Sequence, residues 1–171
     1  MERIAIMGSP GSGKSTLSRE LGKLLDLPVY HLDRIYWNPG WEPTPRSRFR
    51  RRHREILELP RWIIDGHYAW TLEARLAAAD TAVYLDYPRW TCLKRALGRV
   101  LCSGPRPDMA EDCPEGIDKE LLSFLGYIWK FRSQKSTQTQ VLLERARPRM
   151  RILHFKSPRE AERFLRELRG D

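Results

Sequence analysis

The sequence has few cysteines, few lysines and no long apolar run. Its three cysteines form no CxxC pair, so we expect ordinary reduced thiols and no metal site built on cysteine. No apolar stretch approaches the roughly 20 residues that cross a bilayer. The run at residues 4–7 is also too short for a signal peptide. These absences favour a cytoplasmic protein that makes no use of a membrane.

The basic residues of the chain are mostly arginine. Only seven of the 31 basic residues are lysine, and the net charge is +9 with an isoelectric point near 9.8. A guanidinium holds a phosphate or carboxylate through two parallel hydrogen bonds, which suits a protein that binds phosphates. The same excess of positive charge would suit a nucleic-acid-binding protein, so charge alone leaves both classes open.

Short apolar runs alternate with helical patterns along the chain, without internal repeats or low-complexity segments. This alternation is typical of an α/β fold with parallel strands. The sequence predicts five strands, at about residues 3–7, 29–32, 62–65, 81–86 and 151–155. It predicts helices at about residues 14–25, 45–59, 88–101, 117–131 and onward to 145, and after residues 157–160, which resemble a capping box. We therefore expect one doubly wound domain over residues 1–171.

One segment is predicted to form no regular element. Residues 37–43 contain two prolines and a glycine, which interrupt both helices and strands.

The segment Gly8-Ser9-Pro10-Gly11-Ser12-Gly13-Lys14-Ser15 matches the phosphate-binding pattern GxxxxGK[ST] in full. It lies between a predicted strand and a predicted helix, which is the context that the pattern requires. Glycines let main-chain N–H groups point at an anion, and the helix N-terminus adds positive potential. We predict that this loop and Thr16 bind ATP, with Lys14 on the β- and γ-phosphates and the Ser15 hydroxyl on Mg²⁺.

Acidic residues end three predicted strands, at the edge where ligands bind in such sheets. Asp65 is the candidate for a second group on the Mg²⁺ side, with a strand-end cap as the alternative. Asp33 could accept a proton from an acceptor hydroxyl or help to hold Mg²⁺, with a turn aspartate as the alternative. Asp86 precedes Pro88 and is better explained as a structural cap.

These motifs resemble the adenylate-kinase-like P-loop kinases, and more closely the bacterial family labelled DNA topology modulation proteins. Besides the phosphate loop, the segments that carry the resemblance are residues 31–41, 62–68, 79–81, 85–90 and 106–109. Together they cover about residues 1–131, and the aromatic segment and Arg106-Pro107-Asp108-Met109 are the most specific. The resemblance implies a five-stranded P-loop NTPase fold with strand order 2-3-1-4-5, an acceptor-side excursion at about residues 33–60, and a lid at about residues 101–116.

The resemblance also implies roles for individual residues. Arg95 and Arg99 look like the lid-flanking arginines of nucleotide kinases, which neutralise charge on the transferring phosphoryl group; a solvated helix face is the alternative. Adenylate kinases carry Asp-Gly-Phe-Pro-Arg where this chain has residues 65–69, so Ala69 replaces the arginine for the acceptor phosphate. This difference disfavours AMP as the acceptor. His67 stands where we expect asparagine in the closer family, and it either binds substrate or is a packed, hydrogen-bonded histidine.

The acceptor itself has no signature in the sequence. We expect its site to be formed by Asp33, Tyr36, Trp37, His67 and Arg106. The aromatic rings of Tyr36, Trp37 and Trp41 could stack on a flat substrate. The tryptophans Trp62, Trp90 and Trp129 are instead expected in the core.

Six arginines fall within nine residues of one predicted helix, namely Arg46, Arg48, Arg50, Arg51, Arg52 and Arg54. They form either a solvated face, a surface for nucleic-acid phosphates without sequence readout, or a contact with an anionic acceptor. The sequence as a whole predicts an ATP- and Mg²⁺-dependent small-molecule phosphotransferase. The alternatives are a nucleotide-dependent nucleic-acid-binding protein that affects DNA topology and a domain that holds nucleotide without turnover. No helix-turn-helix, zinc-finger or RNA-recognition pattern is present.

Overall fold

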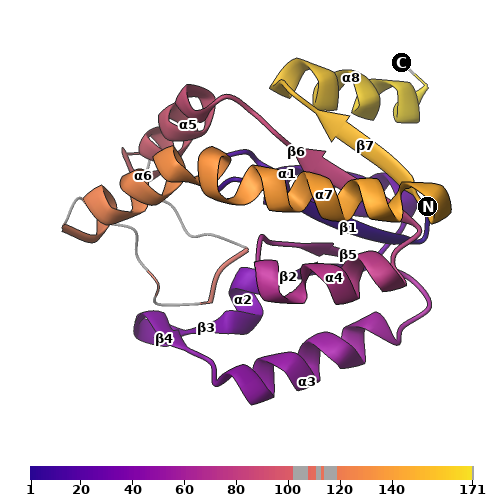
Figure 1. Cartoon of the computed structure of the whole chain (residues 1–171), viewed down its shortest axis with the longest axis horizontal. Helices are drawn as coiled ribbons and strands as arrows, with labels where there is room; N and C mark the ends of the chain where they lie inside the picture. The colour runs from indigo at the N-terminus through magenta and orange to yellow at the C-terminus, as the bar shows by residue number, and fades with distance from the viewer. Residues whose placement is uncertain (102–107, 111–112, 114–118, 171) are drawn as a thin grey trace.

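A parallel sheet of five strands forms the centre of the computed structural model, which describes residues 1–101, 108–110, 113 and 119–170. The order across the sheet is β2-β5-β1-β6-β7 (Figure 1). The strand bounds are Arg3–Gly8 for β1, Val29–His31 for β2, Trp62–Asp65 for β5, Thr81–Leu85 for β6 and Arg151–Phe155 for β7. Counted along the chain, this is the predicted order 2-3-1-4-5, and the predicted fold class is confirmed.

Helices connect the strands and cover both faces of the sheet. Their bounds are Lys14–Leu25 (α1), Leu32–Tyr36 (α2), Arg46–Leu57 (α3), Ala69–Ala78 (α4), Arg89–Leu101 (α5), Lys119–Phe131 (α6), Thr137–Ala146 (α7) and Pro158–Arg169 (α8). A π-helical segment, Arg132–Ser136, joins α6 to α7. The short helix α2 and the helix α4 were missed by the sequence patterns, and the others begin and end within a few residues of their predicted bounds.

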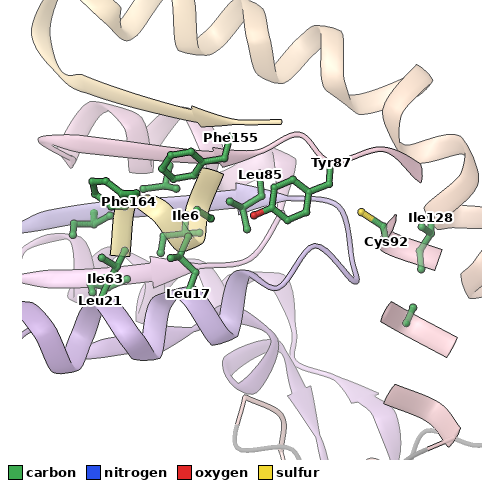
Figure 2. Close-up of a cluster of buried hydrophobic side chains, with 14 of the residues drawn as sticks. Ile6, Leu17, Leu21, Ile63, Leu85, Tyr87, Cys92, Ile128, Phe155 and Phe164 are labelled. Atoms are coloured by element: carbon green, nitrogen blue, oxygen red, sulfur yellow. The ribbon is translucent and has the colours of Figure 1, made fainter. Parts of the chain in front are cut away.

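Alternate residues of the central strand β1 face opposite sides of the sheet, as the two-residue period of a strand requires. Ile4 and Ile6 belong to a core shared with α1, α5 and α8, in which Leu17, Leu21 and Phe164 are buried (Figure 2). A parallel sheet that is apolar on both faces must be covered on both faces, which explains why its strands are almost uniformly buried.

The opposite face of the sheet packs against α3, α4 and α7. Ala5 and Met7 of β1 lie in this second core together with Phe49, Leu72 and Leu143. On α3 the buried residues recur at helical spacing, so the six arginines of this helix are all left exposed on its outer side. In Figure 1, α3 forms the lowest layer of the molecule.

The prediction that residues 37–43 form no regular element was wrong. Trp37–Asn38 (β3) and Glu42–Pro43 (β4) pair as a small antiparallel ladder, and Pro39–Trp41 forms the turn between them. Gly40 at φ 74° and Trp41 at φ 61° both adopt left-handed conformations that reverse the chain. Pro39 lies in the turn and Pro43 in an edge strand of this ladder, and a missing N–H is tolerated at both places.

Two further expectations about side chains need correction. Trp62 is fully buried as expected, but Trp90 and Trp129 are 61% and 41% exposed rather than in the core. Their rings pack edge to face at 5.1 Å on the outer side of α5 and α6, which gives them a partner without burial. Helix α8 begins at Pro158 as predicted, yet the capping-box bonds are different. The Glu160 carboxylate accepts hydrogen bonds from the Lys156 amide and the Ser157 hydroxyl, at 2.8 and 3.0 Å.

Within the part of the chain that the structure describes, no helix has the length and apolar character needed to cross a membrane.

Candidate active site

The phosphate loop runs from the end of β1 into the first turn of α1, as its sequence predicts. Gly8, Gly11 and Gly13 all have positive φ, so the chain turns sharply as it leaves β1. The Ser12 hydroxyl is buried and has no hydrogen-bond partner among the described residues. A buried donor without a partner is costly, and an anion seated in the loop would satisfy it.

Lys14 folds back over this loop. Its Nζ donates a hydrogen bond to the Ser9 carbonyl at 2.9 Å. Burial lowers the pKa of Lys14, while the nearby carboxylates of Asp33 and Asp65 oppose that shift. The structure therefore brings together the loop lysine and both of the acids that the sequence selected.

Arg95 and Arg99 of α5 lie beside the same loop. Arg95 Nη1 donates to the Ser12 carbonyl at 3.2 Å, and its guanidinium lies against Gly13. Both arginines line a cavity of about 390 Å³ together with the loop residues. They therefore face the phosphate-binding region rather than forming a purely solvated helix face.

The same cavity has a wall that sequence reasoning missed. Tyr87, at the end of the sheet, and the first two turns of α8 complete it, through Pro158, Ala161, Glu162 and Leu165. The signal was available, because β7 was predicted as a strand. The helix that follows a parallel strand starts at the carboxyl edge of the sheet, where ligands bind.

Asp65 is held by two side chains that were not predicted. It is only 1% exposed, and its Oδ2 accepts hydrogen bonds from the Ser18 hydroxyl and from His31 Nδ1, the latter at 2.6 Å. Ser18 is also bonded to the Ser15 carbonyl at 3.0 Å. Through Ser18, the two residues predicted on the Mg²⁺ side are joined, Ser15 at the start of α1 and Asp65 at the end of β5.

The residues present fit a magnesium site of the P-loop type. No cluster of three or more His, Cys, Asp or Glu side chains able to hold a metal occurs in the described ranges. Mg²⁺ needs none, because it commonly takes one or two protein ligands and completes its shell with phosphate oxygens and water. In such a site, Ser15 would supply a hydroxyl ligand and Asp65 a carboxylate ligand.

Asp33 lies in α2 and pairs with the acceptor-side turn after β5. The Tyr68 hydroxyl donates to Asp33 Oδ1 at 2.8 Å. Burial raises the pKa of Tyr68, and Asp33 raises it further, so the phenol stays protonated and acts as a donor. The sequence analysis included Tyr68 only within the segment 62–68 and predicted no role for it.

The aromatic residues of the predicted acceptor side pack mainly against one another. Tyr36 contacts Trp37, Phe49 and Tyr68 with ring centroids 4.9–5.5 Å apart. Trp37 also contacts Trp41, at 5.5 Å. They form one cluster that links α2, the β3–β4 hairpin and α3, and their contact with a substrate stays a prediction.

His67 is packed but not hydrogen-bonded within the described structure. Both ring nitrogens are buried without a partner, and the ring lies edge-on to Phe131 at 4.5 Å. Burial lowers the pKa of His67 to about 3, and Lys14, Arg75 and Lys135 lower it further as neighbouring cations. The imidazole is therefore neutral at physiological pH.

Asp86 lies at the carboxyl end of β6, and its oxygens face Arg132 Nε at 3.6 Å and His154 Nε2 at 3.3 Å. The role of Asp86 as a structural cap stays a prediction. Arg106 and most of the predicted lid at residues 101–116 lie outside the described residues.

Comparison with known proteins gives the family of the chain. The sequence pattern of the AAA domain matches residues 4–112, which is more than half of the chain and includes the phosphate loop. This chain belongs to the AAA domain family. No curated protein matches the sequence of this AAA domain.

The solved structures similar to this chain include three kinases. Shikimate kinase from Bacteroides thetaiotaomicron matches with a TM-score of 0.54 and 19% identity, over 99% of this chain and 96% of that chain. Shikimate kinase from Acinetobacter baumannii, in complex with shikimate, matches with a TM-score of 0.56 and 18% identity, over 99% and 94%. Deoxyadenosine kinase from M. mycoides matches with a TM-score of 0.52 and 14% identity, over 98% and 99%. At these identities the likeness establishes a kinase-like P-loop fold.

Proposed function

We propose that this AAA domain is an ATP- and Mg²⁺-dependent phosphotransferase that acts on a small hydroxyl-bearing molecule. One observation carries the proposal. The phosphate loop, Arg95 and Arg99 line one cavity, and Asp33 and Asp65 lie close enough to Lys14 for their charges to oppose the lowering of its pKa by burial. A loop that held nucleotide without turnover would need neither the two arginines over the phosphates nor a second acid on the acceptor side.

Each of these residues has a chemical role that follows from its place. Lys14, released from the Ser9 carbonyl, would bind the terminal phosphates, and Arg95 and Arg99 would offset charge that develops on the transferring phosphoryl group. Ser15 and Asp65 would hold Mg²⁺, which would supply charge stabilisation for the transfer. The cavity wall formed by α8 would limit water around the nucleotide, and catalysis would consist of positioning and charge neutralisation.

Asp33 is the candidate that accepts the proton of the acceptor hydroxyl. The hydrogen bond from Tyr68 holds one carboxylate oxygen, which orients the group. Proton transfer of this kind uses the carboxylate form of Asp33, which lies close enough to Lys14 for their charges to interact. His67, Tyr36 and Trp37 are the proposed acceptor contacts on this side, and Arg106 is a further proposed contact from the lid.

The acceptor is best sought among small molecules. The similar solved structures hold shikimate in one case and the nucleotides dCMP and dCDP in another. Ala69 stands where adenylate kinases have an acceptor-phosphate arginine, so nucleosides and hydroxy acids are better candidates than AMP. The resemblance to the DNA topology modulation family stays a prediction.

A turnover screen tests the function. ADP release would be measured with ATP and Mg²⁺ in the presence of nucleosides, nucleotides, hydroxy acids including shikimate, sugars and short nucleic acids. We expect one class of small molecule to raise turnover well above the basal hydrolysis of ATP, and the Lys14→Ala variant to show neither rate. A protein that binds ATP but responds to no acceptor would be a nucleotide-binding module, and one that binds no ATP would contradict the proposal outright.

The alternative of nucleic-acid binding rests on the exposed face of α3. Its six arginines are all exposed, and none lines the cavity beside the phosphate loop. They are therefore separate from that cavity and would attract a polyanion through non-specific charge. A binding experiment that addresses this face is given below.

A further inference from the structure

A buried cation lies behind the proposed active site. Arg75 of α4 is 0% exposed and is among the largest fully buried side chains of the protein. Its Nη1 donates to the Gly66 carbonyl at 2.8 Å, in the turn between β5 and α4. Its Nε and Nη2 are buried and have no hydrogen-bond partner in the described part of the chain. Among the described residues, Arg75 is therefore a charged side chain with a single hydrogen bond, to one main-chain carbonyl.

Stability alone does not account for an arginine at this position. Removing a guanidinium from water with two donors unsatisfied is costly, and an apolar side chain of similar volume is often more stabilising in such a place. Burial lowers the pKa of Arg75 to about 10, and Asp65 opposes this shift, so the group stays charged at neutral pH. A costly cation kept beside Asp65 points to a role in the site rather than in folding.

The turn that Arg75 holds follows Asp65 directly and packs against the start of α2, which carries Asp33. Gly66 adopts φ 125°, and a Cβ atom placed on it would come within 2.9 Å of Leu32 Cβ. Leu32 immediately precedes Asp33, so this close approach brings the end of β5, with Asp65, against the start of α2. Only glycine permits both the backbone conformation and the contact.

Helix α4 fixes the same turn at a second point. The Thr71 amide and hydroxyl both donate to the Tyr68 carbonyl, at 2.9 and 2.8 Å, and the Tyr68 hydroxyl in turn binds Asp33. Arg75 and Thr71 are one turn apart on the buried face of α4. The helix thereby holds the carbonyls of Gly66 and Tyr68 on either side of His67.

We propose that Arg75 is a positioning residue for phosphoryl transfer. By binding the Gly66 carbonyl, its guanidinium sets the distance between Asp65 on the Mg²⁺ side and Asp33 on the acceptor side, with Lys14 near both. This inference rests on the proposed function. It assigns Arg75 no contact with substrate, because its side chain is enclosed.

The test compares variants on one helix. Arg75→Met keeps the length of the side chain and removes the charge and the donor. We expect its kcat to fall between about tenfold and 10²-fold, as small misplacements of catalytic groups do, while its KM for ATP changes less than about threefold. Arg75→Lys, which keeps the charge and one donor, should recover part of the lost kcat.

Leu76→Ala is the matched control. Leu76 is 3% exposed, lies next to Arg75 on the buried face of α4 and belongs to the apolar core. This substitution should lower Tm through a cavity yet leave kcat within about twofold of the wild type when all variants are assayed well below Tm. Equal losses of kcat in Arg75→Met and Leu76→Ala would show that Arg75 acts through stability only and would overturn the proposal.

A metal-binding readout separates this proposal from the proposed function. Mn²⁺ affinity would be measured by electron paramagnetic resonance with a non-hydrolysable ATP analogue present. Arg75→Met should bind Mn²⁺ more weakly, and Leu76→Ala should not. If the wild type turns over no acceptor, the proposed function fails while this comparison still decides the role of Arg75. An Arg75→Met variant with wild-type Mn²⁺ affinity would refute it.

The proposal can also be tested if Arg75→Met does not fold. Should Arg75→Met be unfolded, hydrogen exchange of residues 65–68 would be compared in Arg75→Lys and the wild type. A lysine cannot reproduce the guanidinium geometry, so faster exchange and a kcat about threefold lower are expected. Unchanged exchange together with unchanged kcat would overturn the proposal.

Discussion

Gly11 of the phosphate loop lies directly against the main chain of Cys92 in the first turn of α5. A Cβ atom placed on Gly11 would collide with the Cys92 carbonyl oxygen and come within 3.0 Å of its carbonyl carbon. The loop is thus packed against the helix that carries Arg95, whose guanidinium reaches back to the Ser12 carbonyl. Loop and arginine are placed relative to each other by main-chain contact.

Gly11→Ala should therefore disrupt ATP binding and lower stability. Gly40→Ala is a matched control, because the φ of Gly40 is 74° against 75° for Gly11, and nothing lies within 4 Å of the added Cβ. The control carries only the cost of a left-handed conformation, about 1–2 kcal/mol. Urea denaturation and ATP titration would compare the two variants. Equal effects would show that the contact with Cys92 is unimportant.

Lys14→Ala should abolish productive triphosphate binding. The side chain is already directed over the loop by its bond to the Ser9 carbonyl, so its loss removes the cation that the phosphates would meet. Isothermal titration with ATP, with and without Mg²⁺, measures the effect, and the thermal unfolding of the unliganded protein should change little. Unchanged ATP affinity and turnover would rule out the phosphate-binding role.

Asp65→Asn should reduce turnover and its Mg²⁺ dependence more than it reduces nucleotide affinity. A group on the metal side acts mainly on charge that develops during transfer. A fall of about 10²-fold or more in kcat is expected for the loss of such electrostatic stabilisation. Ser18→Ala, which removes a bond to the same carboxylate, should have a smaller effect. Wild-type turnover of Asp65→Asn across a Mg²⁺ titration would make Asp65 purely structural.

The free energy of unfolding should fall as the pH drops below about 6.5. Burial lowers the pKa of His53 to about 4 and that of His67 to about 3. Below pH 6.5 these histidines bind protons in the unfolded chain but not in the folded chain. Their contribution to the stability of the fold is therefore complete above pH 6.5 and is lost toward pH 4. Each histidine contributes a slope of up to about 1.4 kcal/mol per pH unit.

Urea denaturation between pH 7.5 and 4.5 measures that slope. His53→Gln and His67→Asn should each reduce it by about one histidine's share, whereas Leu76→Ala should lower stability at every pH without changing the slope. An unchanged slope in both histidine variants would mean that other groups cause the acid destabilisation.

Double-stranded DNA should bind weakly, without sequence preference, and lose affinity steeply between about 50 and 200 mM salt. If α3 is the contact surface, Arg48, Arg51 and Arg52 changed together to glutamine should release DNA and leave acceptor-dependent turnover intact. Arg46 and Arg50 are left in place because their guanidiniums lie 5.9 and 5.6 Å from the Trp70 ring.

The control variant removes three positive charges from a different surface. Arg145, Arg149 and Arg151 are exposed and lie at or near the start of β7, away from the cavity. Equal losses of DNA binding in both triple variants would show that overall charge, and no surface on α3, attracts DNA. Tight binding at 200 mM salt, with turnover stimulated by DNA and by no small molecule, would overturn the phosphotransferase proposal.

Most of the fold could be predicted because its signals are local. The apolar runs at residues 3–7 and 62–65 and the helical spacing of residues 14–25 each determine one element on their own. The strand order followed from the resemblance to P-loop kinases. The hairpin at residues 37–43 was missed because it depends on two consecutive left-handed residues, Gly40 and Trp41, and a non-glycine residue rarely adopts that conformation.

The sequence by itself determined the phosphate loop, because that motif is one continuous segment whose glycines, lysine and serine act through the backbone around them. It also selected Asp33, Asp65 and Arg95 for the same region. Only the tertiary structure decided what holds them. His31 and Ser18 bind Asp65 although they are 34 and 47 positions away in the chain. Helix α8, at the C-terminal end of the described chain, forms one wall of the cavity. Arg75 is buried and binds the turn at Gly66. Such contacts arise from the packing of elements that are remote in sequence, and no local pattern encodes them.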